Sequence, residues 1–241
     1  MKDITFVIPA YNEEQSIGIL LNDIYQLFPD SSIIVINNNS TDRTQEIAEK
    51  FDVIVLAEKR QGKGNAIKTG FKAVKTKYAV MLDADNTYSP HEADKLVIPL
   101  KLDKVDVVLG SRLNDNKEEG AITKFNTIGN HILSFNASLL YNHISDVCTG
   151  YWAFKKEVID YLLKEGITSN GFELEVEMFI KVSRGNYKIG EVPITYRKRS
   201  DLTKLNSVKD GWKIFKTLWI HKFTFTAQNR ETFEDSEIKA K

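Results

Sequence analysis

The sequence predicts an α/β fold, with a mostly parallel β-sheet flanked by helices in a single domain. Through the first half of the chain, short apolar runs alternate with longer amphipathic segments, which is the pattern of repeated strand and helix units. The 241 residues, 42% of them hydrophobic and 27% charged, are enough for one sizeable core. Polar residues follow each apolar run, as expected where ligands bind beyond the carboxyl ends of parallel strands.

The first half of the chain predicts five strands and the helices between them. Residues 14–28 form an amphipathic segment after the first apolar run, ITFVIPA. The helix after the second run is expected to begin near Ser40 or Thr41, either of which can cap it. The expected strands are residues 4–10, 32–37, 53–58, 78–83 and 105–110, and further helices are expected to begin near residues 63 and 90.

From residue 114 onward the pattern changes. A polar loop leads to a long helix expected over residues 122–142. Beyond it we expect a return strand at residues 150–154, a helix ending at Gly185, and a strand pair interrupted at Pro193. Apolar residues three and four positions apart share one face of the long helix: Phe125, Ile128, Ile132, Phe135 and Leu139.

The composition argues against several classes of protein. Thirty-three basic residues balance thirty-three acidic ones, so no net charge attracts nucleic acid, and no nucleic-acid partner is expected. The single cysteine, Cys148, excludes an internal disulfide and fits a reducing cytoplasm. No window approaches the roughly 20 apolar residues that a membrane-spanning helix needs. We therefore expect a cytoplasmic protein.

Two aspartates one residue apart follow the fourth apolar run, in the stretch MLDADNTYSP. Asp83 and Asp85 lie where a buried strand relaxes into a turn, so both carboxylates can converge on one ion. Such hard oxygen ligands suit Mg²⁺ or Mn²⁺, which share a substrate diphosphate with the protein. The alternative is that acidic residues commonly end strands and begin helices. Nearby, Gly62 and Gly64 flank a helix start at Lys63, where free N–H groups can meet an anion.

Several motifs lie along the chain in a characteristic order: VIPAYNEE, the polar turn of residues 37–44, GKGNAIKTG, DAD, GSR, DVCTGYWAF and EVPITYRKRSDLTKL. Together they resemble the motifs of family 2 glycosyltransferases of the GT-A (Rossmann-like) fold, and in particular the dolichyl-phosphate and polyprenyl-phosphate sugar synthases. The resemblance extends from Ile4 to about Trp219. It implies a metal-dependent glycosyltransferase with Mg²⁺ or Mn²⁺ as cofactor.

The resemblance also implies roles for individual residues. The residues expected to bind the nucleotide are Pro9, Tyr11, Glu13, Asn37, Asn38 and Lys63. Asp83 and Asp85 are the expected metal ligands and, with Arg112, the expected catalytic residues. The residues expected to bind the phosphate of the acceptor are Arg112, Lys124, Arg199 and Lys204. Without the resemblance, each of these cations would be interpreted as a solvated surface charge.

The chain departs from the family pattern at Asn37 and at Thr87, and its loop from Arg199 to Lys204 lacks the glycine common in relatives. Where relatives usually read VDDGS or VDNNS this chain reads INNNS, so Asn37 replaces an aspartate that is expected to contact the base. An amide both donates and accepts hydrogen bonds, so the change bears on the choice between uracil and guanine. Thr87 stands where some relatives carry a glutamine, which leaves a third protein ligand for the metal open.

The expected reaction is the inverting transfer of a hexose or N-acetylhexosamine to dolichyl or polyprenyl phosphate, as in protein glycosylation. The expected donor is a UDP-sugar in preference to GDP-mannose. Because a phosphate monoester has a second pKa of about 6, the acceptor needs positioning more than a strong base. Two alternatives remain open. One is the same fold acting on a soluble or saccharide acceptor, and the other is a non-catalytic nucleotide-binding protein.

The C-terminal region predicts how the protein meets its acceptor. We divide the chain into a GT-A domain of residues 1–206, an amphipathic helix of residues 207–225 and a polar tail of residues 226–241. Such a helix suits the headgroup boundary, which predicts a peripheral enzyme on the cytoplasmic face of a membrane. The alternative is a helix that packs its apolar side on the domain. Its apolar residues recur at helical spacing among lysines: Trp212, Phe215, Leu218, Trp219 and Phe223.

Overall fold

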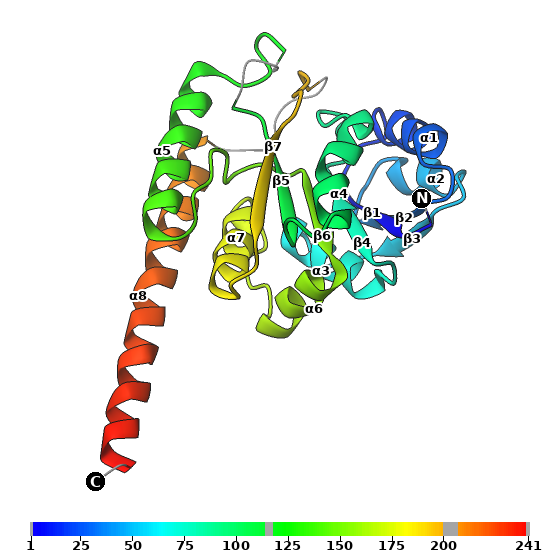
Figure 1. Cartoon of the computed structure of the whole chain (residues 1–241). Helices are drawn as coiled ribbons and strands as arrows, with labels where there is room; N and C mark the ends of the chain where they lie inside the picture. Colours follow the sequence, from blue (N-terminus) through cyan, green and yellow to red (C-terminus); the bar gives the residue numbers. More distant parts are fainter. Residues whose placement is uncertain (1, 114–117, 200–206, 240–241) are drawn as a thin grey trace.

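The computed structural model describes residues 2–113, 118–199 and 207–239, with side chains as far as Phe223. Within these residues the chain forms one seven-stranded sheet with helices on both faces (Figure 1). The predicted α/β class and the mostly parallel sheet are confirmed. The strands are β1 (Ile4–Ala10), β2 (Ser32–Asn37), β3 (Ile54–Ala57), β4 (Tyr78–Met81), β5 (Val107–Ser111), β6 (Trp152–Lys155) and β7 (Ile189–Pro193).

The strand order, β3-β2-β1-β4-β6-β5-β7, reverses in the middle of the sheet. β1 pairs in parallel with β2 on one side and with β4 on the other, so the chain builds outward from β1 and then returns to its opposite side. β6 runs antiparallel between β4 and β5. In an open sheet of this kind a crevice forms at the carboxyl ends of the strands where the order reverses. Here that position lies between the ends of β1 and β4.

The helices form a layer on each face of the sheet. α1 and α4 cover the face to which Phe6 and Ile8 of β1 point, and α3, α6 and α7 cover the face to which Val7 points. α8 packs against both α5 and α7. The helices are α1 (Ile17–Leu27), α2 (Thr44–Ala48), α3 (Lys63–Ala73), the 3₁₀ helix η1 (Pro90–Glu92), α4 (Ala93–Lys101), α5 (Lys124–Leu140), α6 (Lys156–Glu165), α7 (Leu174–Arg184) and α8 (Ser207–Lys239).

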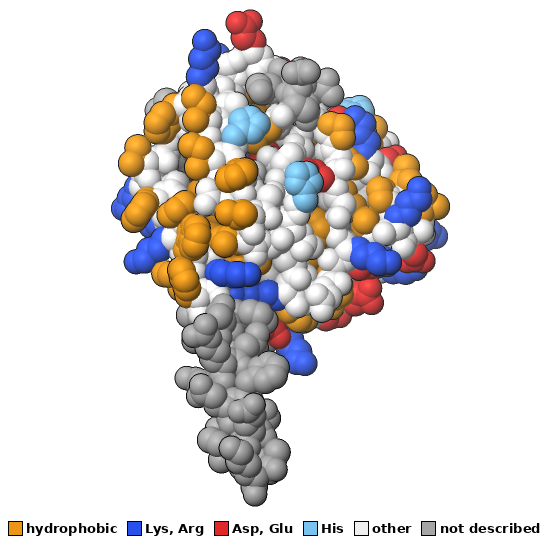
Figure 2. Space-filling model, turned by 60° about the vertical axis from the view of Figure 1, so that its left-hand side comes forward, with side chains coloured by type: hydrophobic (Ala, Val, Ile, Leu, Met, Phe, Trp, Pro, Cys, Tyr) orange, Lys and Arg blue, Asp and Glu red, His pale blue; other side chains and the backbone are white. Residues whose placement is uncertain are grey.

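The two outermost helices expose apolar side chains. α5 forms where expected, but the apolar face predicted from its spacing is exposed, and the helix packs on the core through Leu133 and Ala137 instead. Figure 2 shows hydrophobic side chains gathered over this part of the molecule. Along α8, Leu218 is buried in the core whereas Trp212 and Phe223 are exposed. Within the described ranges, no helix is both long enough and apolar enough to cross a membrane.

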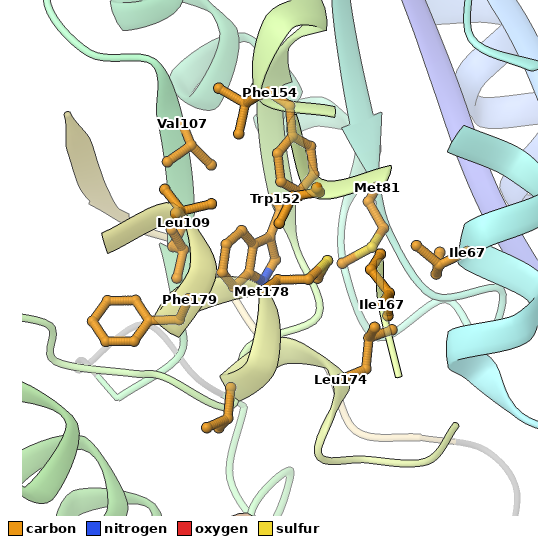
Figure 3. Close-up of a cluster of buried hydrophobic side chains, with 14 of the residues drawn as sticks. Ile67, Met81, Val107, Leu109, Trp152, Phe154, Ile167, Leu174, Met178 and Phe179 are labelled. Carbon is orange, nitrogen blue, oxygen red and sulfur yellow. The ribbon is translucent and has the colours of Figure 1, made fainter. Parts of the chain in front are cut away.

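The centre of one core lies between β6 and α7 (Figure 3). Trp152 of β6 is fully buried and stacks on Phe154, with 5.6 Å between the ring centroids. Its indole N–H donates a hydrogen bond of 2.6 Å to the carbonyl of Thr149. Met178 and Phe179 of α7 belong to the same cluster. The indole therefore fills the core and also fixes the backbone just before β6, next to the crevice.

Two predicted details near the ends of helices are wrong. α2 begins at Thr44, and Asp42, rather than Ser40 or Thr41, accepts the hydrogen bond from the N–H of Thr44, at 3.0 Å. The carboxylate of Asp42 reaches this N–H from two residues before it, which leaves the two hydroxyl residues outside the helix. α8, which was expected to end near residue 225, continues to Lys239. The segment expected as a polar tail contains no Gly or Pro to interrupt a helix.

The strand pair predicted around Pro193 is also only partly present. β7 ends at Pro193, and beyond it a single bridge joins Tyr196 to Tyr88. The backbone N–H groups after β7 go to different partners, such as the Ser111 carbonyl for Ile194 at 3.0 Å. Because these partners do not lie on one strand, the segment crosses the end of the sheet without extending it.

Trp152→Ala should lower the free energy of unfolding by about 3–5 kcal/mol, because it empties a fully buried site and leaves the Thr149 carbonyl without its donor. Urea unfolding followed by circular dichroism measures the loss. Trp212→Ala is the matched control, and it should cost less than about 1 kcal/mol because 66% of Trp212 is exposed. Equal losses in the two variants would contradict this description of the core.

Candidate active site

Acidic side chains from three elements meet at the crevice between β1 and β4. Glu13 follows β1, Asp83 and Asp85 follow β4, and Glu175 lies in the first turn of α7. Two cations, Lys63 and Arg199, each form ion pairs with two of these carboxylates. The carboxylate cluster is the name used below for Glu13, Asp83, Asp85, Glu175 and the two cations, Lys63 and Arg199.

Arg199 joins the ends of the two strands. Its Nη1 lies 2.7 Å from Oδ2 of Asp85, and its Nη2 lies 2.6 Å from Oε1 of Glu13. The other oxygen of Asp85 accepts hydrogen bonds from the hydroxyl of Thr87 at 2.6 Å and from its N–H at 3.1 Å. Burial and the charge of Asp83 raise the pKa of Asp85, although Thr87 and Arg199 oppose the shift. A further positive charge nearby would therefore stabilise the ionised form of Asp85.

Lys63 binds the second pair of carboxylates. Its Nζ lies 2.6 Å from Oδ1 of Asp83 and 2.6 Å from Oε1 of Glu175. Burial alone would lower the pKa of Lys63, but the charges of Asp83 and Glu175 outweigh burial and raise it. Gly150 closes the group from another side. A Cβ added there would lie 2.7 Å from Oδ2 of Asp83 and 3.0 Å from Nζ of Lys63.

The donor set of the cluster fits a divalent cation. Four carboxyl groups face two cations, so with all of them ionised the cluster has two more negative than positive charges. Hard carboxylate oxygens are the ligands that Mg²⁺ and Mn²⁺ prefer, and Asp83 and Asp85 are the residues suited to hold such an ion. Among the described residues, no group of three or more His, Cys, Asp or Glu side chains is arranged as a complete metal site. Waters and a substrate diphosphate would have to complete the coordination.

Asn38 shapes the loop that leads into α3. It is buried, and its amide nitrogen donates to the carbonyls of Glu58 at 3.0 Å and Arg60 at 2.8 Å. Its amide oxygen accepts from the N–H of Gly62 at 2.8 Å. These three bonds join the end of β2 to the loop after β3. Any contact that Asn38 makes with a nucleotide would be in addition to this structural use.

Asn37, at the end of β2, is held by its own turn. Its amide nitrogen donates to Oε1 of Gln45 at 2.7 Å, and its oxygen accepts from the N–H of Ser40 at 3.1 Å. An amide has a second donor hydrogen and a second acceptor lone pair, so Asn37 keeps capacity for a ligand. Pro9 and Tyr11 lie half-buried at the neighbouring end of β1. Three residues predicted to bind the nucleotide therefore lie along two adjacent strand ends: Pro9, Tyr11 and Asn37.

The two glycines at the start of α3 make room for another part of the protein. Gly62 has a φ of 127°, and a Cβ there would lie 2.4 Å from the carbonyl oxygen of Asn170. At Gly64 a Cβ would lie 1.8 Å from the carbonyl oxygen of Ser169, and the N–H of Gly64 donates to Asn170. Buried Glu177 fixes this loop by accepting from the N–H of Ser169 at 2.6 Å. Close packing of α3 thus accounts for both glycines.

Arg112, the residue after β5, pairs with the buried Asp146. Its guanidinium donates two hydrogen bonds of 2.8 Å to the carboxylate of Asp146, and its backbone N–H donates a third of 2.9 Å. It also lies over the ring of Tyr196, 5.4 Å from the centroid. A phosphate bound by Arg112 would have to compete with Asp146. Two lysines were also predicted to bind phosphate. Lys124 is exposed at the start of α5, and Lys204 lies outside the described residues.

Sequence reasoning missed three residues of this region: Glu175, Asp146 and Gly150. Glu175 carried a readable signal, because it lies among apolar residues of a helical stretch, where burial requires a partner. Asp146 is the first residue of the quoted motif DVCTGYWAF. The partner of each could not be read, since Lys63 and Arg112 lie far away in the chain. Gly150 stood in a quoted motif, but its closeness to Asp83 depends on the antiparallel pairing of β6 with β4.

Comparison with known proteins bears on the class of the chain. Residues 5–163 match the family model described as Glycosyl transferase family 2. The chain is 34% identical over 217 residues to a dolichyl-phosphate hexose transferase of Haloferax volcanii, covering 90% of this chain and 92% of that protein. It is 29% identical over 237 residues to a UDP-N-acetylglucosamine–dolichyl-phosphate N-acetylglucosaminyltransferase of Methanococcus voltae, covering 89% and 94%.

The fold is also found among solved structures. Glucosyl-3-phosphoglycerate synthase from Mycobacterium tuberculosis, in complex with Mn²⁺, uridine diphosphate and glucosyl-3-phosphoglycerate, matches with a TM-score of 0.73. The match covers 91% of this chain and 79% of that chain at 19% identity, so the likeness is one of fold. Fold and sequence together define a GT-A glycosyltransferase. The chain belongs to glycosyltransferase family 2, as its motifs predicted.

Gly64→Ala should lower the free energy of unfolding by about 1–3 kcal/mol, because its Cβ would overlap the Ser169 carbonyl. Gly129→Ala in α5 is the matched control. It has open space around the added Cβ and should raise the free energy of unfolding by about 0.5–1 kcal/mol. Chemical unfolding of both variants measures the difference, and a gain in stability for Gly64→Ala would show that α3 does not pack as described.

Proposed function

We propose that the protein transfers one sugar, with inversion, from a UDP-sugar to dolichyl or polyprenyl phosphate, in a reaction that requires Mg²⁺ or Mn²⁺. The observation that carries the proposal is the carboxylate cluster, which lies where the strand order of the sheet reverses. Its surplus of negative charge would repel a diphosphate unless a divalent cation joined the two. The names of the two relatives support the acceptor, and the Mn²⁺ and uridine diphosphate complex of the structural neighbour supports the ion and the base.

The proposed reaction forms one bond and breaks one. An oxygen of the acceptor phosphate attacks the anomeric carbon from the side opposite the nucleotide. The bond between that carbon and the diphosphate breaks, and its electron pair leaves with UDP. The acceptor is already largely ionised, because its second pKa is about 6, so no strong base is needed. A bound divalent ion would neutralise the charge that develops on the leaving diphosphate.

The residues of the chain would hold and orient the reactants. Asp83 and Asp85 would bind the ion, and Lys63 would keep Asp83 in position through the contact of 2.6 Å. Arg199 spans Glu13 and Asp85 and lies partly buried. When Asp85 binds the metal ion, the guanidinium of Arg199 is available to a phosphate, which arginine binds through two parallel N–H groups. Arg112, Lys124 and Lys204 complete the proposed set of phosphate-binding residues.

The setting of the reaction follows from the acceptor. A polyprenyl chain stays in a membrane, so the enzyme would act as a peripheral protein on the cytoplasmic face. The GT-A domain of residues 1–206 would carry the chemistry, and the helix from residue 207 would contribute membrane contact. Because Leu218 is buried and Trp212 exposed, α8 would serve the core on one side and the membrane on the other.

A donor panel tests the proposed function. UDP- and GDP-sugars are each incubated with a short-chain polyprenyl phosphate and Mg²⁺ or Mn²⁺, and both nucleoside diphosphate release and partition of the sugar into solvent are measured. The proposal requires a sugar in the lipid phase that depends on the metal. Release of UDP with a water-soluble product would instead favour a soluble or saccharide acceptor. Absence of turnover with every donor, despite metal-dependent UDP binding, would favour a non-catalytic nucleotide-binding protein.

Asp85→Asn should reduce turnover by at least about a hundredfold, because an amide keeps the shape of the side chain but removes the charge that holds the ion. Asp83→Asn should be impaired nearly as much. Initial rates at saturating Mn²⁺ measure both. Asp103→Asn is the control, because the Asp103 side chain is 74% exposed and its partner Lys155 also pairs with Asp106. Near-parental turnover in Asp85→Asn would remove Asp85 from the proposed site.

Asn37→Asp should change the preference between UDP and GDP. The carboxylate still accepts from Ser40, but it presents an oxygen to Oε1 of Gln45, so Gln45 has to turn and lose its bond to Glu49. Calorimetry with both nucleotides in the presence of Mn²⁺ measures the ratio of the two dissociation constants. The exposed change Asn22→Asp should leave this ratio unaltered. An unaltered ratio in Asn37→Asp as well would place Asn37 outside the base pocket.

A further inference from the structure

A row of large apolar side chains on α5 has no cover in the described part of the protein. Each member of the row has between 53% and 69% of its surface exposed. The helix is held to the core by its opposite side, through Leu133 and Ala137, so the row does not face the interior. Contiguous apolar patches of this kind are rare on soluble monomers and usually mark an interaction surface. The row consists of Phe125, Ile128, Ile132, Phe135 and Leu139.

α8 extends the same surface. It packs beside α5, and the hydroxyl of Tyr141, one residue after α5, donates to the carbonyl of Leu218 at 3.0 Å. Successive aromatic rings along α8, from Trp212 to Phe223, have centroids 5.8, 6.2 and 5.9 Å apart. The apolar face is the name used below for the α5 row together with Val208, Trp212 and Phe223, all of them exposed.

The charged residues around the apolar face are mainly positive. α5 contains no acidic residue, and the only one in residues 207–223 is Asp210, which pairs with Lys213 at 3.8 Å. Because the whole chain has equal numbers of basic and acidic residues, this positive charge is a local property of the two helices. Figure 2 shows lysine and arginine side chains beside the hydrophobic ones. The exposed lysines are Lys124, Lys209, Lys213, Lys216 and Lys222.

A groove connects the apolar face with the end of β5. It has a volume of about 490 Å³, and its lining includes Phe135 and Leu139 of the α5 row. Ser145 also lines the groove, and its hydroxyl lies 2.8 Å from that of Ser111, the residue before Arg112. The apolar face is therefore continuous with the segment that binds Arg112 at the carboxyl edge of the sheet.

We propose that the apolar face docks on a phospholipid bilayer that contains anionic lipids, with α5 as a principal contact beside α8. Apolar side chains bordered by lysines suit a helix lying in the plane of the headgroups, where the side chains enter the acyl boundary and the ammonium groups meet lipid phosphates. The benefit of docking rests on the proposed function, since it brings the site to a membrane-bound acceptor. The surface itself is independent of the reaction.

A second copy of the chain fits this face less well. In a two-fold dimer the same patch meets itself, so the five lysines of each copy would approach those of the other. Like charges brought together at an interface are unfavourable, whereas anionic lipids supply the opposite charge. The charge of the apolar face therefore favours a bilayer over self-association.

Flotation of the full chain with phosphatidylcholine vesicles, prepared with and without phosphatidylglycerol, tests the proposal. The protein should bind most strongly to vesicles that contain phosphatidylglycerol. The double variant Ile128→Gln and Ile132→Gln should lower the bound-to-free ratio by about tenfold or more, because two apolar contacts with the acyl boundary are lost. The matched control is Ile19→Gln with Ile98→Gln, on α1 and α4, whose isoleucines are 54% and 51% exposed. It should bind as the parent does.

Equal binding by the two double variants, both with parental thermal unfolding, would overturn the proposal, as would failure of the parent to bind either vesicle. A parent dimer in light scattering that only the α5 variant dissociates would assign the face to a second copy instead. The flotation assay contains no sugar donor or acceptor, so its result does not depend on the proposed reaction. Vesicle binding without transfer to polyprenyl phosphate would contradict the proposed function alone, and transfer to a short-chain acceptor without vesicle binding would contradict the docking proposal alone.

Discussion

The arrangement of this protein depends on negative charge concentrated where the strand order reverses. Asp83, Asp85 and Glu13 come from the ends of adjacent strands, and Glu175 is buried beside them. Like charges in a partly buried crevice are costly unless cations accompany them. The cations come from α3 and from the segment after β7, so pairing the charges draws distant parts of the chain to one edge of the sheet.

Packing of the backbone fixes where these cations lie. Lys63 is the first residue of α3, and the glycines on either side let that helix approach the Ser169–Asn170 loop more closely than any other residue would allow. Arg199 follows a segment tied down at several points, including a hydrogen bond of 2.8 Å from the N–H of Thr195 to Glu92. The side chains of the site are thus positioned by contacts that lie outside it.

The sequence pattern was sufficient to predict the sheet and the helices that flank it. Alternating runs predicted the sheet, and the resemblance carried by the motifs assigned Asp83 and Asp85 to the metal, Lys63 to the nucleotide and Arg199 to the acceptor phosphate. In the structure Lys63 pairs with Asp83, and Arg199 pairs with Asp85. The sequence pattern did not predict pairs of distant residues, such as Arg112 and Asp146, because which residues meet depends on strand order. Nor could it orient α5, since spacings of three and four describe a buried stripe and an exposed one equally well.

The central claim is that the carboxylate cluster and a nucleotide diphosphate bind one divalent ion together. Calorimetry of UDP binding to the full chain, with Mn²⁺ and with a chelator, tests it most directly. The account predicts that Mn²⁺ tightens UDP binding by about tenfold or more and that UDP tightens Mn²⁺ binding by the same factor, because coupling between two ligands is reciprocal. UDP affinity that is the same with Mn²⁺ and with chelator would contradict the account.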